Sequence, residues 1–116
     1  MDFKGLHVAV TGAGAPTGIG RAFANMFQAE GAIVSISDLS KPEIGQDSGL
    51  IGYACDVGNE DAICKFIDDA EAASGPIDVF IANAGVGFSD GADGAASGDN
   101  KSWDVSWAVN VMGAVY

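Results

Sequence analysis

Residues 6–20 read LHVAVTGAGAPTGIG, and this stretch decides the fold that we expect. The apolar run Val8-Ala9-Val10 ends at Thr11-Gly12, which is typical of a short buried strand. A glycine-rich turn follows, and residues 19–30 then carry an apolar helix face formed by Ile19, Phe23, Met26 and Phe27. A strand, a glycine turn and a helix open many nucleotide-binding domains, because glycine lets the backbone approach a pyrophosphate and a helix start offers free N–H groups.

The glycine spacing points to one family. It does not fit G-x-G-x-x-G, because Gly12-Ala13-Gly14 is followed by Gly18, one residue too late; Gly14 to Gly20 fits G-x-x-x-G-x-G instead. With this pattern the chain resembles the short-chain dehydrogenases/reductases, whose first turn reads T-G-x-x-x-G-x-G, although Thr11-Gly12 stands two residues earlier here. The resemblance implies a set of cofactor-binding residues in this loop: Gly12, Gly14, Thr17, Gly18, Ile19 and Gly20. A helix-entry turn in an unrelated α/β domain is the alternative.

Composition limits the classes of function. The 116 residues allow one domain, residues 1–116, and five basic against sixteen acidic residues give a formal net charge of −11. This charge disfavours binding to nucleic acid or to an anionic membrane surface. No apolar run approaches the roughly 18 residues of a membrane span, and Met1 to Lys4 lack a signal-peptide pattern, so we predict a cytoplasmic protein.

Neither the cysteines nor the histidine indicates a reactive site. Cys55 and Cys64 fit no metal-ligand spacing and no disulfide framework, so we predict buried thiols and no metal. His7 begins the first expected strand, at the end away from the glycine turn, and we predict a structural role for it.

The second expected strand, residues 32–37, leads to a candidate residue for binding the ribose of a dinucleotide. It ends at Asp38, and an acidic residue about 20 positions after the glycine turn commonly accepts hydrogen bonds from the adenosine ribose. Such a carboxylate also repels a 2′-phosphate, so Asp38 favours NAD over NADP as the cofactor. Arg21 is a competing signal, because an arginine can pair with a 2′-phosphate; an ordinary turn residue is the alternative for Asp38.

A polar loop over residues 39–48 separates this strand from the third one, residues 50–54. Asp56-Val57 follow, and the family resemblance implies that this aspartate reaches the adenine amino group. Asn59 is expected to cap the next helix, which ends near Ser74-Gly75. The apolar stripe of that helix is formed by Ile63, Phe66, Ile67 and Ala70.

The fourth expected strand, residues 77–82, leads into Asn83-Ala84-Gly85. The family reads Asn-Asn-Ala-Gly here, so Ala82 replaces the first asparagine, while Asn83 matches the second, which lines the cofactor site. Ala84 and Gly85 are small enough to let a cofactor pack against the backbone. The strand is apolar on both alternations, which is typical of a central strand, yet in the expected order 3-2-1-4 it lies at an edge.

The last segment carries the one catalytic residue that we predict. Residues 86–102 read as a surface loop whose aspartates lack the spacing of a calcium loop, and Ser102 is a candidate helix N-cap. A stripe at every fourth position is expected to face the core: Trp103, Trp107, Val111 and Val115. The run from Trp103-Asp104 to Val109-Asn110-Val111 resembles the family's fourth long helix, which implies that Asn110 belongs to the catalytic tetrad and holds a water.

These observations predict a Rossmann-type, doubly wound α/β fold with a parallel sheet in three layers, incomplete at its C-terminal side. The resemblance implies the cofactor-binding half of an NAD-linked oxidoreductase that acts on an alcohol or carbonyl compound. The family's catalytic serine and its Tyr-x-x-x-Lys lie well downstream of Asn110, so we expect this chain alone to be inactive. We expect the apolar fourth strand to pair with missing chain, a second polypeptide or a copy in a homo-oligomer.

Two alternatives from other classes stay open. A complete but non-catalytic dinucleotide-binding or interaction module would carry the same motifs. A mononucleotide or flavin binder fits less well, because Asp38 and Asp56 match the adenosine end of a dinucleotide.

Overall fold

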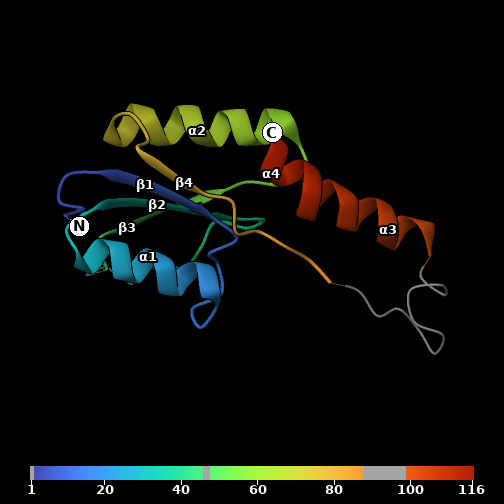
Figure 1. Cartoon of the computed structure of the whole chain (residues 1–116), viewed down its shortest axis with the longest axis horizontal. Coiled ribbons are helices and arrows are strands. Elements are labelled where there is room, and N and C mark those ends of the chain that lie inside the picture. Colours follow the sequence, from blue (N-terminus) through green and yellow to red (C-terminus); the bar gives the residue numbers. More distant parts are fainter. Residues whose placement is uncertain (1, 46–47, 88–98) are drawn as a thin grey trace.

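A computed structural model describes residues 2–45, 48–87 and 99–116. It contains a four-stranded parallel sheet in the order β3-β2-β1-β4, with α1 on one face and α2 on the other, so the predicted doubly wound α/β fold is confirmed (Figure 1). The strands are β1 (His7–Thr11), β2 (Ile33–Asp38), β3 (Leu50–Ala54) and β4 (Val79–Ile81). The helices are α1 (Ile19–Ala29), α2 (Glu60–Ser74), α3 (Asn100–Ser106), the π-helical η2 (Trp107–Met112) and α4 (Gly113–Val115).

The sheet is organised around β1, all of whose residues are buried. Val8 pairs with Val34 of β2 on one side and with Val79 of β4 on the other. At its first residue, the His7 ring contacts the Ser35 hydroxyl and the Gly75 carbonyl oxygen, each at 2.8 Å. Both ring nitrogens therefore have partners inside the fold, and the structural role predicted for this histidine is confirmed.

Side-chain alternation along β1 and β2 divides the core in two. Val8 and Val10 of β1 pack against α1, in a cluster that also contains Val34 and Ile36 of β2 and Ala24 and Phe27 of the helix. Ala9 points to the other side, into a cluster with α2 that contains Phe66. Because both faces of the sheet are covered, β1 carries the continuous apolar run Val8-Ala9-Val10, whereas in β2 the alternate residues Ser35 and Ser37 are buried as well.

Helix α1 begins where predicted but presents a different face to the sheet. Its buried residues are Gly20, Arg21, Ala24 and Phe27. Of the apolar face predicted from spacing, only Phe27 is buried, whereas Ile19 is 72% exposed and Phe23 and Met26 are also exposed. The small side chains of Gly20 and Ala24 let the helix approach the sheet closely, and this close packing outweighs the burial of the larger residues.

Helix α2 follows the prediction closely. The Asn59 side chain accepts a hydrogen bond from the N–H of Ala62 at 3.0 Å, which is the expected N-cap. Its buried residues are Ile63, Phe66 and Ala70, and Ile67 is partly buried beside them. The helix ends at Gly75, whose φ of 86° favours glycine.

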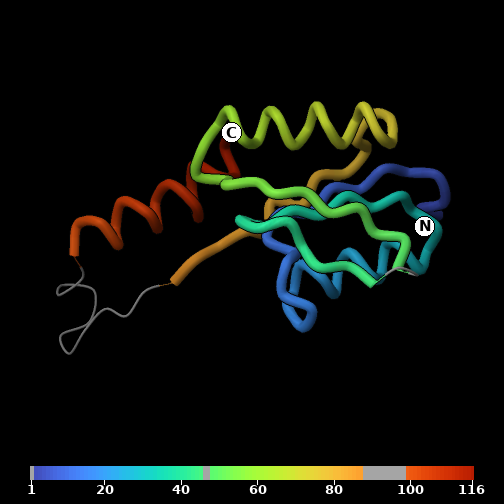
Figure 2. Tube along the Cα trace, turned by 180° about the vertical axis from the view of Figure 1, so that it is seen from behind, coloured from blue at the N-terminus to red at the C-terminus, as the bar shows by residue number. Residues whose placement is uncertain are grey.

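The C-terminal segment differs from the sequence expectation in two ways. Asp99, and not Ser102, caps α3, because its carboxylate accepts a hydrogen bond from the N–H of Ser102 at 2.8 Å. The stripe that we expected to face the core is exposed, with Trp107 at 61% and Val115 at 68%. The apolar residues recur with helical spacing, but they stay exposed, and the helical segment that carries them lies beside the sheet rather than over one of its faces (Figure 2). The predicted loop between residues 86 and 102 lies largely outside the described residues.

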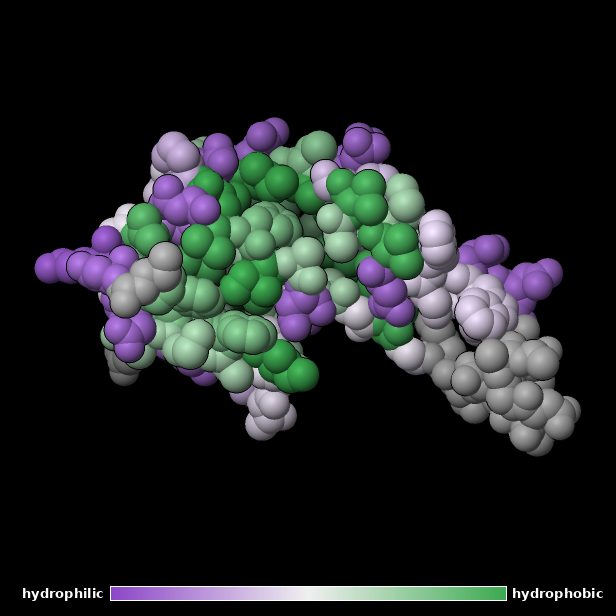
Figure 3. Space-filling view, viewed as in Figure 1, coloured by the Kyte–Doolittle hydropathy of each residue, from purple (hydrophilic) through white to green (hydrophobic). Residues whose placement is uncertain are grey.

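The exposed apolar surface continues at the edge of the sheet. β4 is an edge strand, as the expected order required, and its Phe80 is 39% exposed. Figure 3 shows apolar side chains gathered on the face where β4 lies below α2. Among the described residues, no helix has the length and apolar character needed to cross a membrane.

Candidate functional site

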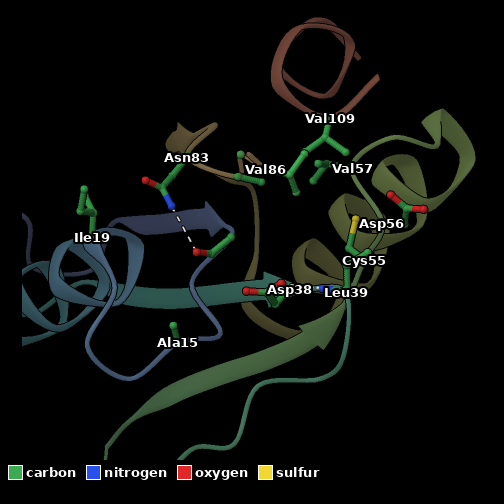
Figure 4. A pocket seen from close by; sticks show the side chains of 13 residues that line it. Ala15, Ile19, Asp38, Leu39, Cys55, Asp56, Val57, Asn83, Val86 and Val109 are labelled. Carbon is green, nitrogen blue, oxygen red and sulfur yellow. Dashed lines mark hydrogen bonds between the residues drawn. The ribbon is translucent and has the colours of Figure 1, made fainter. Parts of the chain in front are cut away.

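A cleft of about 410 Å³ opens where β1 and β2 end and the chain turns away from the sheet (Figure 4). The carboxyl ends of parallel strands are the usual position of ligand sites in open α/β sheets. The lining residues come from the ends of all four strands, from α1 and from η2: Gly12, Ala15, Ile19, Asp38, Leu39, Cys55, Asp56, Val57, Asn83, Ala84, Gly85, Val86 and Val109.

Gly12 brings the first turn against the end of β4. Its φ is 68°, and a Cβ at this position would lie 2.6 Å from the Cα of Ala84, a backbone atom that cannot move aside easily. The Asn83 side-chain amide donates to the carbonyl oxygen of Gly12 at 3.2 Å (Figure 4) and also to that of Thr11 at 3.1 Å. Asn83 therefore fixes the two strand ends to each other at the cleft.

The two additional residues of the glycine loop are accommodated without disturbing the sheet. The N–H of Ala13 donates to the carbonyl of Ser37 at 3.0 Å, so the chain still follows β2 beyond the end of β1. A tight turn then runs from Ala15 to Gly18, closed by a 3.0 Å hydrogen bond from the N–H of Gly18 to the carbonyl of Ala15. Pro16 occupies the second position of this turn, which its fixed φ suits.

The first turn of α1 offers donors that could hold an anion. The N–H of Ala22 donates to Gly18, but those of Ile19, Gly20 and Arg21 donate to no group in the described part of the chain. A Cβ on Gly20 would lie 2.5 Å from the Asn83 amide nitrogen and 2.9 Å from the backbone carbonyl oxygen of Gly12, which cannot move aside easily, so glycine is needed between the helix start and the strand ends. Unpaired N–H groups at the positive end of a helix dipole favour a phosphate or carboxylate group.

Asp38 stands at the end of β2 with both carboxylate oxygens oriented. Oδ2 accepts from the N–H of Gly14 and Oδ1 from the N–H of Leu39, each at 2.8 Å. The residue is partly exposed and lines the cleft. Because each carboxylate oxygen has two lone pairs, Asp38 can still accept hydrogen bonds from hydroxyl groups.

Arg21, the residue that could pair with a 2′-phosphate, uses its guanidinium to bind backbone carbonyls instead. It is only 8% exposed and donates through Nε to the carbonyl of Ala13 at 2.9 Å. Its Nη2 donates to the carbonyls of Gly14 and Glu43 at 3.1 and 3.2 Å. Arg21 is not among the residues that line the cleft.

Residues 55–57 form the wall below η2. Burial raises the pKa of the Cys55 thiol, and the negative charge of Asp56 raises it further, so this buried group stays a neutral thiol. Asp56 is exposed and accepts a hydrogen bond from the N–H of Gly58 at 2.9 Å. Val57 packs in the α2 cluster, with Val109 of η2 against it.

Asn110 lies beside the cleft rather than in its lining. Its amide oxygen accepts from the N–H of Val86 at 2.8 Å and its amide nitrogen donates to the carbonyl of Val86 at 2.9 Å. The residue is exposed and sits in the π-helical η2, and such segments often occur at functional sites. The structure thus pairs Asn110 with the segment that follows β4.

Most of the predicted residues meet in one place. Those that line the cleft are Gly12, Ile19, Asp38, Asp56, Val57, Asn83, Ala84 and Gly85. Gly14 lines an adjoining depression with Asp38, whereas Thr17, Gly18, Gly20 and Asn110 line neither. In residues 2–45, 48–87 and 99–116, no three potential metal ligands among His, Cys, Asp and Glu come together.

Sequence reasoning missed five residues of the lining: Ala15, Leu39, Cys55, Val86 and Val109. Ala15, Leu39, Cys55 and Val86 each directly adjoin a predicted residue, and that adjacency could have indicated them. Val109 comes from η2 across the cleft, and no pattern in the sequence places it there.

Comparison with known proteins agrees with this geometry. The family model for short chain dehydrogenase matches residues 6–116. An isoepoxydon dehydrogenase of Penicillium expansum is 30% identical over 123 residues, which cover 97% of this chain and 44% of that protein. A sorbose reductase of Candida albicans is 37% identical over 99 residues, covering 78% of this chain and 34% of that protein.

Solved structures give the same result. Ligand-free aldohexose dehydrogenase of Thermoplasma acidophilum superposes with a TM-score of 0.85 at 31% identity, covering 99% of this chain and 42% of that one. A 3-ketoacyl-(acyl-carrier-protein) reductase of Brucella melitensis in complex with NADH gives 0.84 at 28% identity, covering 97% and 47%. The chain thus spans half or less of the length of these relatives, and over that span it belongs to the short-chain dehydrogenase/reductase family of oxidoreductases.

Proposed function

We propose that residues 1–116 form a partial NAD(P)-binding domain, the cofactor-binding part of an NAD(H)-linked oxidoreductase. The bound dinucleotide would accept or donate a hydride in the interconversion of an alcohol and a carbonyl compound. The observation that carries this proposal is that one cleft is lined both by Ile19, whose N–H at the start of α1 donates to no described residue, and by the oriented Asp38 carboxylate. That pair suits the pyrophosphate and the ribose hydroxyls of a dinucleotide.

The fit of the residues to the cofactor rests on backbone as much as on side chains. A Cβ at Gly12 would collide with the backbone of Ala84, and one at Gly20 with the backbone carbonyl of Gly12 and the Asn83 side chain, so the loop needs glycine at both positions. In this proposal the glycine loop, with Gly14, Thr17, Gly18 and Ile19, holds the pyrophosphate. Asp38 binds the adenosine ribose, and Asp56-Val57 bound the adenine. Asn83, Ala84 and Gly85 would lie against the nicotinamide half.

Two side chains favour NAD over NADP in this proposal. A 2′-phosphate would meet the Asp38 carboxylate, and two like charges in contact repel each other. Arg21, the residue that could have neutralised that phosphate, donates instead to three backbone carbonyls. The NADH complex of the Brucella reductase is a property of that protein and is consistent with this choice.

Asn110 is proposed as the contribution of this chain to catalysis, through the water that its family counterpart holds. Its two hydrogen bonds to Val86 fix η2 beside the end of β4. This arrangement supports the proposal that the water lies near the nicotinamide end of the cleft. General acid–base chemistry would come from the serine, tyrosine and lysine that the family carries downstream. The exposed apolar side chains of β4 and η2 support assembly with further polypeptide, including a copy of this chain.

Titration calorimetry of the chain with NAD and with NADP tests the proposal. We expect NAD to bind at least about tenfold more tightly than NADP, which corresponds to about 1.4 kcal/mol. Asp38→Asn removes the charge with little change of shape and should narrow that ratio. Asp68→Asn, on the exposed face of α2, removes the same charge and should leave the ratio unchanged. The absence of binding of either dinucleotide would refute the proposal, and tighter binding of NADP would refute the choice of cofactor.

A further inference from the structure

Arg21 is an unusual residue for its position. It is the third residue of α1, where the positive end of the helix dipole disfavours a cation. It is nevertheless buried, and in the described part of the chain no carboxylate forms an ion pair with it. Its partners are three backbone carbonyl oxygens, at 2.9, 3.1 and 3.2 Å. A buried guanidinium needs such partners, and these belong to two different loops.

Two of the three carbonyls that Arg21 holds lie in the glycine loop, at Ala13 and Gly14. At Ala13, the N–H donates to the Ser37 carbonyl and the C=O accepts from Arg21. At Gly14, the N–H donates to Asp38 and the C=O accepts from Arg21. Every polar backbone atom of these two residues is therefore paired.

This pairing matters for an anion in the cleft. Carbonyl oxygens carry partial negative charge and would repel a phosphate, whereas N–H groups attract it. Because Arg21 is buried and absent from the cleft lining, the carbonyls of Ala13 and Gly14 that point to it point away from the cleft. The loop is also two residues longer than the family's pattern, and a longer loop has more conformations to restrict.

We propose that Arg21 is a positioning residue for the cofactor loop. Its guanidinium fork holds Ala13, Gly14 and the Glu43 carbonyl of the β2–β3 loop together, so that the N–H groups at the start of α1 stay open to the pyrophosphate. This inference rests on the proposed function, because it assigns Arg21 a role toward the dinucleotide that binds there. Lysine cannot replace it, since a single ammonium group lacks the planar, divergent donors that reach three carbonyls.

The experiment compares two ligands on variants of the chain. NMR titration gives the dissociation constants of NAD and of adenosine, which lacks phosphate. Arg21→Lys retains the charge but should raise the dissociation constant of NAD at least about tenfold, because a loosely held site binds poorly. The dissociation constant of adenosine should change less than about twofold. Lys65→Ala, on the exposed face of α2, removes a cation far from the cleft and should change neither constant.

The outcomes separate this inference from the proposed function. If the unmodified chain binds no NAD, the proposed function fails whatever Arg21 does. If it binds NAD and Arg21→Lys binds NAD equally well, or loses NAD and adenosine in the same proportion, the positioning role alone is refuted. If Arg21→Lys does not fold, hydrogen exchange on the unmodified chain decides. The Nε–H of Arg21 should be protected from exchange with solvent, and rapid exchange would overturn the positioning role of Arg21.

Discussion

Residues 6–87 and residues 99–116 both carry regular apolar stripes, yet the structure fully buries side chains only in the first region, and there not in every stripe. All five residues of β1 are buried, and α2 buries three of its side chains, whereas α3, η2 and α4 bury none. The difference teaches that an apolar stripe marks a surface that needs a partner, and does not show that the partner is at hand. In the first region the partner is the sheet; in the second no described residue fills that role.

The second region is attached through a few small contacts. A Cβ on Gly113 would lie 3.0 Å from the carbonyl oxygen of Val57, so α4 closely approaches the loop that joins β3 to α2. Ala108 and Val109 lie near Gly58, and Asn110 bonds to Val86. These contacts place η2 against the cleft while its Trp107 stays exposed, so the attachment serves the site more than it serves the core.

The largest expected effect contrasts an aromatic residue in each region. Phe66 is 1% exposed and packs against Tyr53, with ring centroids 5.5 Å apart, so Phe66→Ala should lower the free energy of unfolding by about 3–5 kcal/mol. Trp107 is 61% exposed, and Trp107→Ala should lower it by less than about 1 kcal/mol. Urea unfolding followed by circular dichroism measures both. Equal losses would mean that the C-terminal stripe is buried in solution, and the contrast between the regions would fall.

The same contrast explains how far the sequence could predict the fold. The glycine turn and the Asn59 cap follow from local signals, because each depends on a few neighbouring residues, whereas the strand order followed from the fold that the motifs and the family resemblance implied. The prediction of which face of α1 is buried was wrong. Ile19 and Phe23 have helical spacing, but the close packing of Gly20 and Ala24 selects the adjacent face. Periodicity identifies a helix, but which side packs depends on the shape of the surface it meets.

The site divides in the same manner. Asp38 and Asn83 could be placed from the sequence because both follow a strand directly, and strand ends meet at one edge of the sheet. Val109 could not, since its position depends on how η2 crosses the cleft. The partners of Arg21 are backbone carbonyls from two loops, which no residue pattern encodes. The sequence already favoured Asp38 over Arg21, because Asp38 lies at a strand end, but the hydrogen-bond partners of Arg21 are known only from the structure.

A smaller effect separates glycines that share a conformation. Gly12 and Gly5 have φ values of 68° and 79°, but a Cβ on Gly5 would meet nothing within 4 Å, whereas one on Gly12 would strike Ala84. Gly5→Ala should therefore cost about 1 kcal/mol of strain, and Gly12→Ala about 3 kcal/mol because strain and collision add. Thermal unfolding of both variants checks the difference. Equal losses would show that the strand ends at the cleft can separate without cost, contrary to the close packing described.

The smallest effect concerns the contact that joins the two regions. Asn110→Ala removes both hydrogen bonds to Val86, and because the residue is exposed we expect a loss of only about 1 kcal/mol in the free energy of unfolding. Asn25→Ala, on the exposed side of α1, makes the same change away from the cleft and should cost nothing, since alanine favours a helix. Amide hydrogen exchange is the sharper measurement, because the N–H of Val86 should lose its protection in Asn110→Ala alone. If Val86 stays protected, another group holds that segment, and η2 is joined to the cleft through Val57 and Gly58 rather than through the asparagine.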